Sequence, residues 1–238
     1  MPAATDFHLF GPAHLAILIV VPVCAGGLTW ITHRKPATDT WTRVTLAALL
    51  SLSGLWWYWY RFSVLRMHLP QGLPFELCDV SLLLTIYSLL RLQQWSFELA
   101  YYWGLGGATM AVLTPDLLAP LLSTSSISFF IRHGGVIIAL LYLLWSNCLR
   151  PRPRSWRFAF LTLNLYAAAI AAYDFLFGTN YLYLRNKPAS ASLLNAMGTW
   201  PLYIFIADVF ALVLFLLMAV PFSNSSARTS VSRISSSS

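Results

Sequence analysis

Cys78 and His133 are the side chains in this sequence whose chemistry goes furthest beyond packing. Cys78 opens a predicted helical segment, and the positive end of the helix dipole there favours the thiolate form. A histidine beside such a thiol serves as its base and makes it a nucleophile for acyl transfer. We expect Asp79 or Asp208 to orient the imidazole and to complete the candidate catalytic set.

The other two cysteines lack such surroundings. Cys24 lies in the middle of an apolar run, and Cys148 is expected at a membrane interface, so both are interpreted as packing residues. The three cysteines lie in different segments and form no CxxC pair, which argues against a disulfide framework and a zinc site. Packing remains the alternative for Cys78, and an interhelical hydrogen bond remains the alternative for His133.

Composition places these residues in a membrane. Hydrophobic residues make up 58% of the 238 residues and charged residues only 10%, whereas roughly a quarter of a soluble domain is charged. Such a chain could not cover its surface in water, which excludes a soluble enzyme, a nucleic-acid-binding domain and a disordered protein. The fold class we expect is all-α, as a polytopic membrane protein of one domain.

Seven apolar runs are candidates to cross a bilayer, which takes about 20 residues. They lie at 14–32, 42–60, 77–92, 95–114, 127–146, 156–177 and 201–222. With the N-terminus outside, most of the 15 Lys and Arg fall on the inner side, so we expect an N-out, C-in topology. Six spans and a re-entrant segment are the alternative. Residues 1–222 form the predicted transmembrane domain, and the Ser-rich residues 223–238 a disordered cytoplasmic tail.

In this topology the ionisable groups gather at one depth, near the outer ends of the spans. Groups of this kind are costly within a membrane and are usually functional. A single layer is typical of a binding site, whereas a proton or ion pathway needs groups at several depths. The residues that we expect to bind substrate are His14, Arg132, Asp174, Asn180, Tyr181, Tyr183, Arg185, Lys187 and Trp200.

The stretch at 178–188, together with 198–201, is rich in turn formers and hydrogen-bonding groups. We interpret it as an ordered cap over the outer face, which serves as a lid or as a headgroup-binding surface in which Arg185 and Lys187 bind a lipid phosphate. The alternatives are an ordinary interfacial loop, a helix cap in the case of Asp174, and contact with lipid headgroups in the case of Arg132.

Four motifs resemble a known family of membrane proteins. They are F-x-x-x-H at 10–14, L-P-F-E-L-C-D at 73–79, His-Gly at 133–134 and the long pattern N-Y-x-Y-L-x-x-K-P-x-x-x-S-L-L-N-x-x-G-x-W-P-x-Y at 180–203. Together they look like the bacterial YwaF family, which is similar to the eukaryotic transmembrane protein 164 family. The chain departs from the bacterial pattern at Glu76, where many members have His, and at Thr199, where many have Pro.

The resemblance implies a cysteine-dependent phospholipid acyltransferase, with Cys78 as the nucleophile and His133 as its base. Such an enzyme moves a fatty acyl chain between glycerophospholipids through an acyl-cysteine, here at the outer-leaflet side of a bacterial cytoplasmic membrane. Water as the acceptor would make it a lipase. The carboxylate of Glu76 beside the thiol works against thiolate formation. Membrane phospholipids are the expected partners, and no cofactor or metal is expected.

A transporter or small-ligand binding protein that uses the same outward-facing pocket without covalent chemistry is the alternative. Transporters usually contain inverted repeats and broken helices, and no internal repeat is evident, although the glycines at 104–107 could break a helix. Retinal is bound through a Schiff base to a lysine within a membrane span. The only lysines in the sequence, Lys35 and Lys187, both lie in predicted loops, which excludes a retinal-binding photoreceptor. The net charge of +7 reflects topology, so no nucleic-acid partner is expected.

Overall fold

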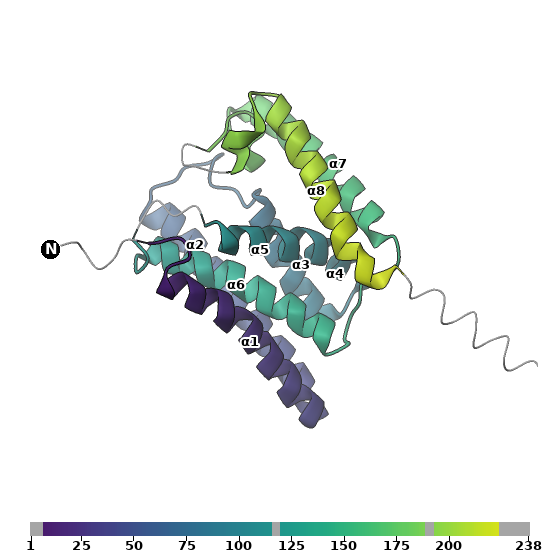
Figure 1. Ribbon diagram of the computed structural model, residues 1–238. Coiled ribbons are helices and arrows are strands. Elements are labelled where there is room, and N and C mark those ends of the chain that lie inside the picture. Colours follow the sequence, from purple (N-terminus) through teal and green to yellow (C-terminus); the bar gives the residue numbers. More distant parts are fainter. Residues whose placement is uncertain (1–6, 116–119, 189–192, 224–238) are drawn as a thin grey trace, which may run out of the picture.

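The computed structural model describes residues 7–115, 120–188 and 193–223, and the regular secondary structure in these ranges is helical throughout (Figure 1). The predicted all-α fold class is therefore confirmed. The Ser-rich tail that the sequence predicts to be disordered lies, apart from Ser223, outside the described residues.

The helices coincide with the apolar runs. They are α1 (Pro12–Arg34), α2 (Asp39–Ser63), α3 (Leu77–Arg91), α4 (Gln94–Leu99), α5 (Gly106–Leu113), α6 (Thr124–Trp145), α7 (Ser155–Phe177) and α8 (Leu202–Ala219). A π-helical turn, Ala100–Leu105, joins α4 to α5 without a break. Short 3-10 turns lie at Pro36–Thr38, Tyr181–Tyr183, Leu193–Met197 and Val220–Phe222.

Four of these helices are long and apolar enough to cross a membrane. They are Pro12–Arg34, Thr124–Trp145, Ser155–Phe177 and Leu202–Phe222. The runs predicted at 42–60, 77–92 and 95–114 also form helices, but seven spans and the N-out orientation stay predictions. The glycines at 104–107 do not break the chain into two helices, since the π-turn carries the helix through them.

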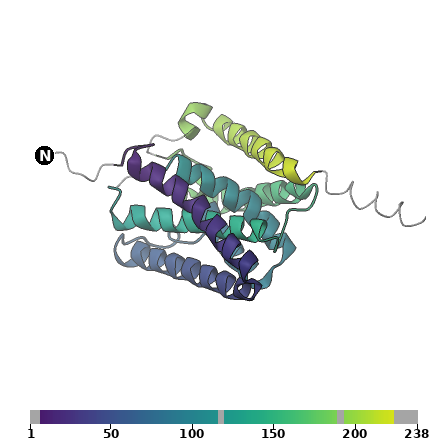
Figure 2. The same ribbon diagram turned by 60° about the horizontal axis from the view of Figure 1, so that its bottom comes forward.

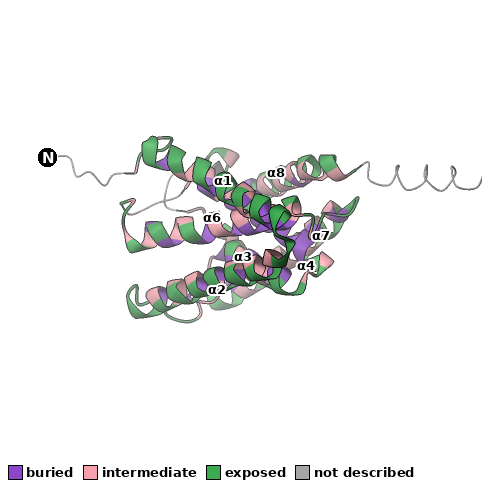
Figure 3. Cartoon of the chain, turned by 90° about the horizontal axis from the view of Figure 1, so that it is seen from below, coloured by how far each residue is buried: buried purple, intermediate pink, exposed green. Residues whose placement is uncertain are grey.

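Helix α6 is the centre of the bundle, because α1, α2, α3 and α5 all pack against it. In its most apolar window 56% of the residues are buried, against 11% in α7 and in α8. Helices α7 and α8 pair with each other, and α8 lies on the opposite side of the bundle from α2 (Figures 1 and 2). Exposed residues cover much of α1 and α8, as suits helices that face lipid (Figure 3).

Two adjacent glycines allow the close packing around α6. A Cβ atom on Gly135 would lie 2.8 Å from Cδ2 of Leu50 in α2, and one on Gly134 would lie 3.2 Å from Cγ2 of Val21 in α1. Small residues at such contacts are how membrane helices approach one another closely. These glycines therefore allow α1 and α2 to pack closely against α6.

We call the end of the bundle that carries the 148–154 loop the basic end, and the end that carries 64–76, 178–188 and 193–201 the cap end. At the basic end, Asp39 accepts hydrogen bonds from Tyr142 Oη at 2.7 Å and from Arg43 Nε at 2.9 Å. Fully buried Glu98 accepts from the backbone N–H, Nε and Nη2 of Arg152 at 2.7–2.9 Å. Asp39 thus joins the start of α2 to α6, and Glu98 joins α4 to the 148–154 loop.

Candidate active site

A cavity of about 250 Å³ lies between α3, α5 and α6 at the cap end. Its lining consists of Glu76, Leu77, Cys78, Ser81, Leu82, Trp103, Gly104, Gly107, Ala108, Ala111, Arg132, His133, Val136, Leu182 and Tyr183. The cavity thus brings the two reactive side chains singled out in the sequence, Cys78 and His133, to one place. Its remaining wall is mostly apolar, and the 182–183 segment of the cap closes one side.

Cys78 is the second residue of α3, and its side chain is exposed to the cavity. The helix begins here because Glu76 is extended, with φ −68° and ψ 145°, and its carbonyl oxygen accepts from the N–H of Asp79 and of Val80. The N–H groups of Leu77 and Cys78 have no acceptor among the described residues. They and the positive end of the helix dipole favour a negative charge at the thiol, whereas the neighbouring carboxylates of Asp79 and Glu76 oppose it.

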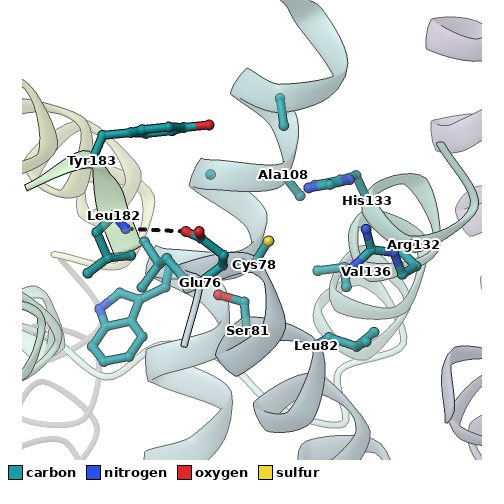
Figure 4. Close-up of a pocket in the computed structure, with 15 residues that line it drawn as sticks. Glu76, Cys78, Ser81, Leu82, Ala108, Arg132, His133, Val136, Leu182 and Tyr183 are labelled. Atoms are coloured by element: carbon teal, nitrogen blue, oxygen red, sulfur yellow. Dashed lines mark hydrogen bonds between the residues drawn. The ribbon is translucent and has the colours of Figure 1, made fainter. Parts of the chain in front are cut away.

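His133 enters the cavity from α6 in a defined tautomer. Its Nδ1 lies 2.8 Å from the carbonyl oxygen of Phe129, which can only accept, so Nδ1 carries the proton. In the neutral ring Nε2 is then the unprotonated nitrogen, and it has no hydrogen-bond partner in the described part of the chain. The Phe129 ring packs against the imidazole at 4.2 Å between centroids. Figure 4 shows the imidazole and the Cys78 sulfur both pointing into the space beside Ala108.

Asp79 lies on α3 next to Cys78, but its carboxylate contacts a different set of residues. It is 3% exposed and accepts from Tyr58 Oη at 2.7 Å and from Arg132 Nη1 at 3.4 Å. The guanidinium of Arg61 lies 3.9 Å away. The expected role of Asp79 as the group that orients His133 therefore has no contact to support it, and the Phe129 carbonyl occupies that place instead.

Arg132 lines the cavity and is held from two sides. Asp79 binds its Nη1, and the Trp57 ring lies under the guanidinium at 4.6 Å. Its Nε is buried and has no partner among the described residues, and the same holds for Oγ of Ser81, which also lines the cavity. The cavity wall thus keeps one cationic donor and one hydroxyl unused.

Asp208 and His14 lie away from the cavity. Asp208 accepts a hydrogen bond from Nδ2 of Asn164 at 3.1 Å, which pairs α8 with α7. Both ring nitrogens of His14 are used, since Nε2 donates to the Val112 carbonyl at 2.7 Å and Nδ1 accepts from the Phe10 N–H at 2.9 Å. His14 therefore ties the start of α1 to the end of α5, and neither residue faces the reactive pair.

The polar residues after α7 hold the cap itself together. Asp174 Oδ1 accepts from Thr179 Oγ1 at 2.5 Å and from the Tyr181 N–H at 3.0 Å, which joins α7 to the turn that follows it. Asn180 Oδ1 accepts from the N–H groups of Arg185 and Asn186, each at 3.0 Å. Arg185 Nη1 donates to the carbonyl oxygens of Asp174 and Thr179 at 3.2 and 3.4 Å. Arg185, and not the Asp174 side chain, therefore supplies donors to the carbonyl groups at the end of α7.

Tyr181 joins the cap to the segment that precedes α3. Its side chain is buried, and its hydroxyl donates to the Pro70 carbonyl at 2.7 Å and accepts from the Leu73 N–H at 2.9 Å. The next N–H, of Leu182, donates to the Glu76 carboxylate at 3.3 Å (Figure 4). Burial raises the pKa of that carboxyl above its ordinary value.

The remaining expected substrate ligands point elsewhere. Lys187 Nζ donates to the Gly198 carbonyl and packs on the Tyr203 ring. Trp200 Nε1 donates to the Leu184 carbonyl at 3.1 Å. Of the residues expected to bind substrate, the structure brings only Arg132 and Tyr183 to the cavity with the reactive pair.

The comparisons with known proteins agree with this architecture. A model of the TMEM164 family matches residues 9–219, which include the cavity and the cap. The chain belongs to the TMEM164 family. Neither a curated protein nor a solved structure matches it. The likeness to that family drawn from the motifs is therefore confirmed, and the bacterial YwaF name remains a resemblance.

The sequence prediction missed several residues around the TMEM164-family site. Trp57, Tyr58 and Arg61 belong to the aromatic stretch that ends α2, a pattern that also indicates an ordinary interfacial belt. The available signal was the spacing of Arg61, which follows Tyr58 by three residues and Trp57 by four and so lies near both on the helix surface. Ser81 follows Cys78 by one helical turn and could have been found in the same way.

Proposed function

We propose that this member of the TMEM164 family transfers a fatty acyl chain between membrane glycerophospholipids through an acyl-cysteine on Cys78. The observation that carries the proposal is that the exposed thiol of Cys78 and the unprotonated Nε2 of His133 open onto one cavity. Thiol and base in a shared, mostly apolar site are what covalent acyl transfer needs.

The first step acylates the cysteine. His133 Nε2 takes the thiol proton as Cys78 Sγ attacks the ester carbonyl carbon, so that an S–C bond forms. The N–H groups of Leu77 and Cys78 face the oxyanion that develops on the carbonyl oxygen. The ester C–O bond then breaks, and His133 returns the proton to the departing lysophospholipid oxygen.

The second step releases the acyl chain. The hydroxyl of a second lysophospholipid gives its proton to His133 Nε2 and attacks the thioester carbonyl carbon. The new C–O bond forms, the C–S bond breaks, and the proton goes to the thiolate of Cys78. Because the same imidazole acts first as base and then as acid, its unoccupied Nε2 is required in both steps.

The other cavity residues position the lipid. The unpartnered Nε of Arg132 binds an anionic oxygen of the substrate, and Asp79 holds the guanidinium in place. The cavity of about 250 Å³ is below the roughly 300–1,000 Å³ of sites that enclose a whole drug-sized ligand. It therefore receives the reacting ester and the atoms next to it, while the rest of the lipid stays in the membrane.

Intact-protein mass spectrometry tests the proposal directly. Purified wild type, incubated in detergent with dipalmitoyl phosphatidylcholine, should gain the mass of a palmitoyl group that neutral hydroxylamine removes. Cys78→Ala should gain none, whereas the matched controls Cys24→Ser and Cys148→Ser should behave as wild type. His133→Ala should slow both formation and release of the adduct.

The opposite result would have a clear meaning. If neither wild type nor His133→Ala carries an adduct under any phospholipid tested, Cys78 is not a nucleophile toward lipid esters. The shared cavity would then belong to a membrane protein that binds or transports a small ligand without covalent chemistry.

A further inference from the structure

The α5 side of the cavity is built from residues with little or no side chain. Gly104, Gly107, Ala108 and Ala111 line it, at spacings of three to four residues that place them on one helix face. The two glycines in this set differ in the space around them: protein atoms surround Gly104 closely, whereas Gly107 borders open space. This difference suggests a role for Gly107.

Gly104 is required by packing. A Cβ atom there would lie 3.2 Å from Leu140 Cδ1, 3.3 Å from Val136 Cγ1 and 3.4 Å from Ser81 Cβ. These neighbours come from α6 and α3, so the missing side chain lets three elements meet beside the π-turn. A substitution at Gly104 would push the walls of the cavity apart.

Gly107 has no such neighbours. A Cβ atom there would meet nothing within 4 Å, and its φ lies outside the positive range that favours glycine. Glycine is less favourable than alanine inside a helix, so neither packing nor backbone conformation accounts for it. Because Gly107 has no side chain, the space beside its Cα stays open, and this space belongs to the cavity that Cys78 and His133 also line.

We propose that Gly107 is a specificity-determining position, and that the acyl-chain segment next to the ester lies in the space over its Cα while Cys78 reacts. This inference rests on the function proposed above. The apolar walls formed by Trp103, Ala108 and Val136 suit methylene groups at this place. A Cβ atom at 107 would enter the volume that the lipid chain uses without contacting any protein atom within 4 Å.

The test is a competition between acyl chains. Wild type, Gly107→Ala and Gly107→Leu are incubated with an equimolar mixture of diacetyl and dipalmitoyl phosphatidylcholine, and the acyl group on Cys78 is identified by mass. An acetyl group lacks the methylene groups next to the ester, so Gly107→Leu should shift the acetyl-to-palmitoyl ratio by about tenfold or more toward acetyl, because one misfitting group in an apolar pocket has effects of this order. Gly107→Ala should shift it less.

Gly27→Leu is the matched control. A Cβ atom on Gly27, in α1, would also meet nothing within 4 Å, but this residue does not line the cavity. The acyl ratio of Gly27→Leu should therefore equal that of wild type. A Gly107→Leu protein that forms the thioester with the wild-type ratio would overturn the inference while leaving the proposed function intact.

A second readout does not depend on catalysis. In a Cys24→Ser, Cys148→Ser background, the rates at which N-ethylmaleimide and N-hexadecylmaleimide alkylate Cys78 are compared. Gly107→Leu should leave the ethyl reagent's rate unchanged, which shows an intact and accessible thiol, and should slow the hexadecyl reagent by about tenfold. If the hexadecyl reagent alkylates Gly107→Leu as fast as it alkylates the protein with Gly107, the inference about Gly107 is contradicted. This result does not depend on whether wild type forms a lipid thioester. The absence of a lipid thioester is a separate outcome, and it contradicts the proposed function.

Discussion

Cys78 and Cys148 lie at opposite ends of the bundle, each near a carboxylate, yet their surroundings differ in one decisive respect. At the basic end, the Cys148 thiol accepts from Ser146 Oγ at 3.1 Å and donates to Asp39 at 3.3 Å. At the cap end, the Cys78 thiol opens onto a cavity. A cluster whose polar atoms all have partners stabilises the fold, whereas one that leaves them unused is prepared for a ligand.

The chemistry of the two thiols follows from this difference. The Cys148 thiol accepts one hydrogen bond and donates another, so it holds the basic end together and leaves no position for a substrate. Around Cys78, by contrast, Arg132 Nε and Ser81 Oγ have no partner among the described residues.

Replacing each cysteine with serine should give the largest difference in acyl-transfer rate between the two ends of the bundle. Cys78→Ser should lower acyl transfer from phospholipid to lysophospholipid at least about a thousandfold, because removing a nucleophile disables the whole catalytic unit. Cys148→Ser keeps a donor for Asp39 and should stay within about twofold of wild type. Transfer of a radiolabelled acyl chain measures both. An equal loss in the two variants would mean that the contrast between the ends is not functional.

The two buried histidines give the next largest effect. His133→Ala should lower thioester formation by about 10²–10⁴-fold, the usual contribution of a general base, and added imidazole should restore part of the rate because the cavity admits it. His14→Ala should show no rescue, since His14 bonds the Val112 carbonyl and the Phe10 N–H and lies away from the cavity. Its effect should be a lower melting temperature. Imidazole rescue of His14→Ala would reverse these assignments.

A substitution at Glu98 tests whether the basic end contributes to stability and not to catalysis. Glu98→Gln removes the charge that the Arg152 guanidinium and N–H bind, and should cost about 1.5–3 kcal/mol of stability, as expected for hydrogen bonds to a charged group. Thermal unfolding in detergent should show the loss. The amount of thioester per folded molecule should remain that of wild type, and a loss of activity without a loss of stability would place the basic end in the catalytic machinery.

The sequence predicted the elements of this site better than their partners. Cys78 at a helix start and the cap after α7 follow from local signals: the Pro-bounded turn at 73–76 and the turn formers at 178–188. The partner of Asp208 could not be predicted in the same way. Asn164 belongs to a different helix, 44 positions away in the chain, and only the packing of α7 on α8 brings the two together.

Asp79 illustrates the same limit within a single site. Its position beside Cys78 indicates a catalytic carboxylate, but one step along a helix turns a side chain by about a quarter of a circle or more. Asp79 therefore faces α2 and Tyr58, while Cys78 faces the cavity. Similarly, His14 looks like a ligand in the sequence because the Val112 carbonyl that it binds is a backbone group with no side-chain signature.

Glu76 gives the smallest effect and the finest test of the cap end. Its carboxylate lines the cavity beside Cys78 and accepts from the Leu182 N–H, a bond that Gln can also accept. Glu76→Gln removes a negative charge that opposes thiolate formation, so thioester formation at neutral pH should rise by about three- to tenfold.

The pH dependence of thioester formation shows whether the faster rate of Glu76→Gln comes from the loss of charge. Burial holds the pKa of the Glu76 carboxyl above its ordinary value, so as pH falls through this raised pKa the wild-type carboxyl takes up a proton and becomes neutral, like Gln. The ratio of the Glu76→Gln rate to the wild-type rate should therefore fall toward one as the pH is lowered and stay constant above the raised pKa. A ratio that does not change with pH would show that the substitution acts through the cap's contact with Leu182 and not through charge.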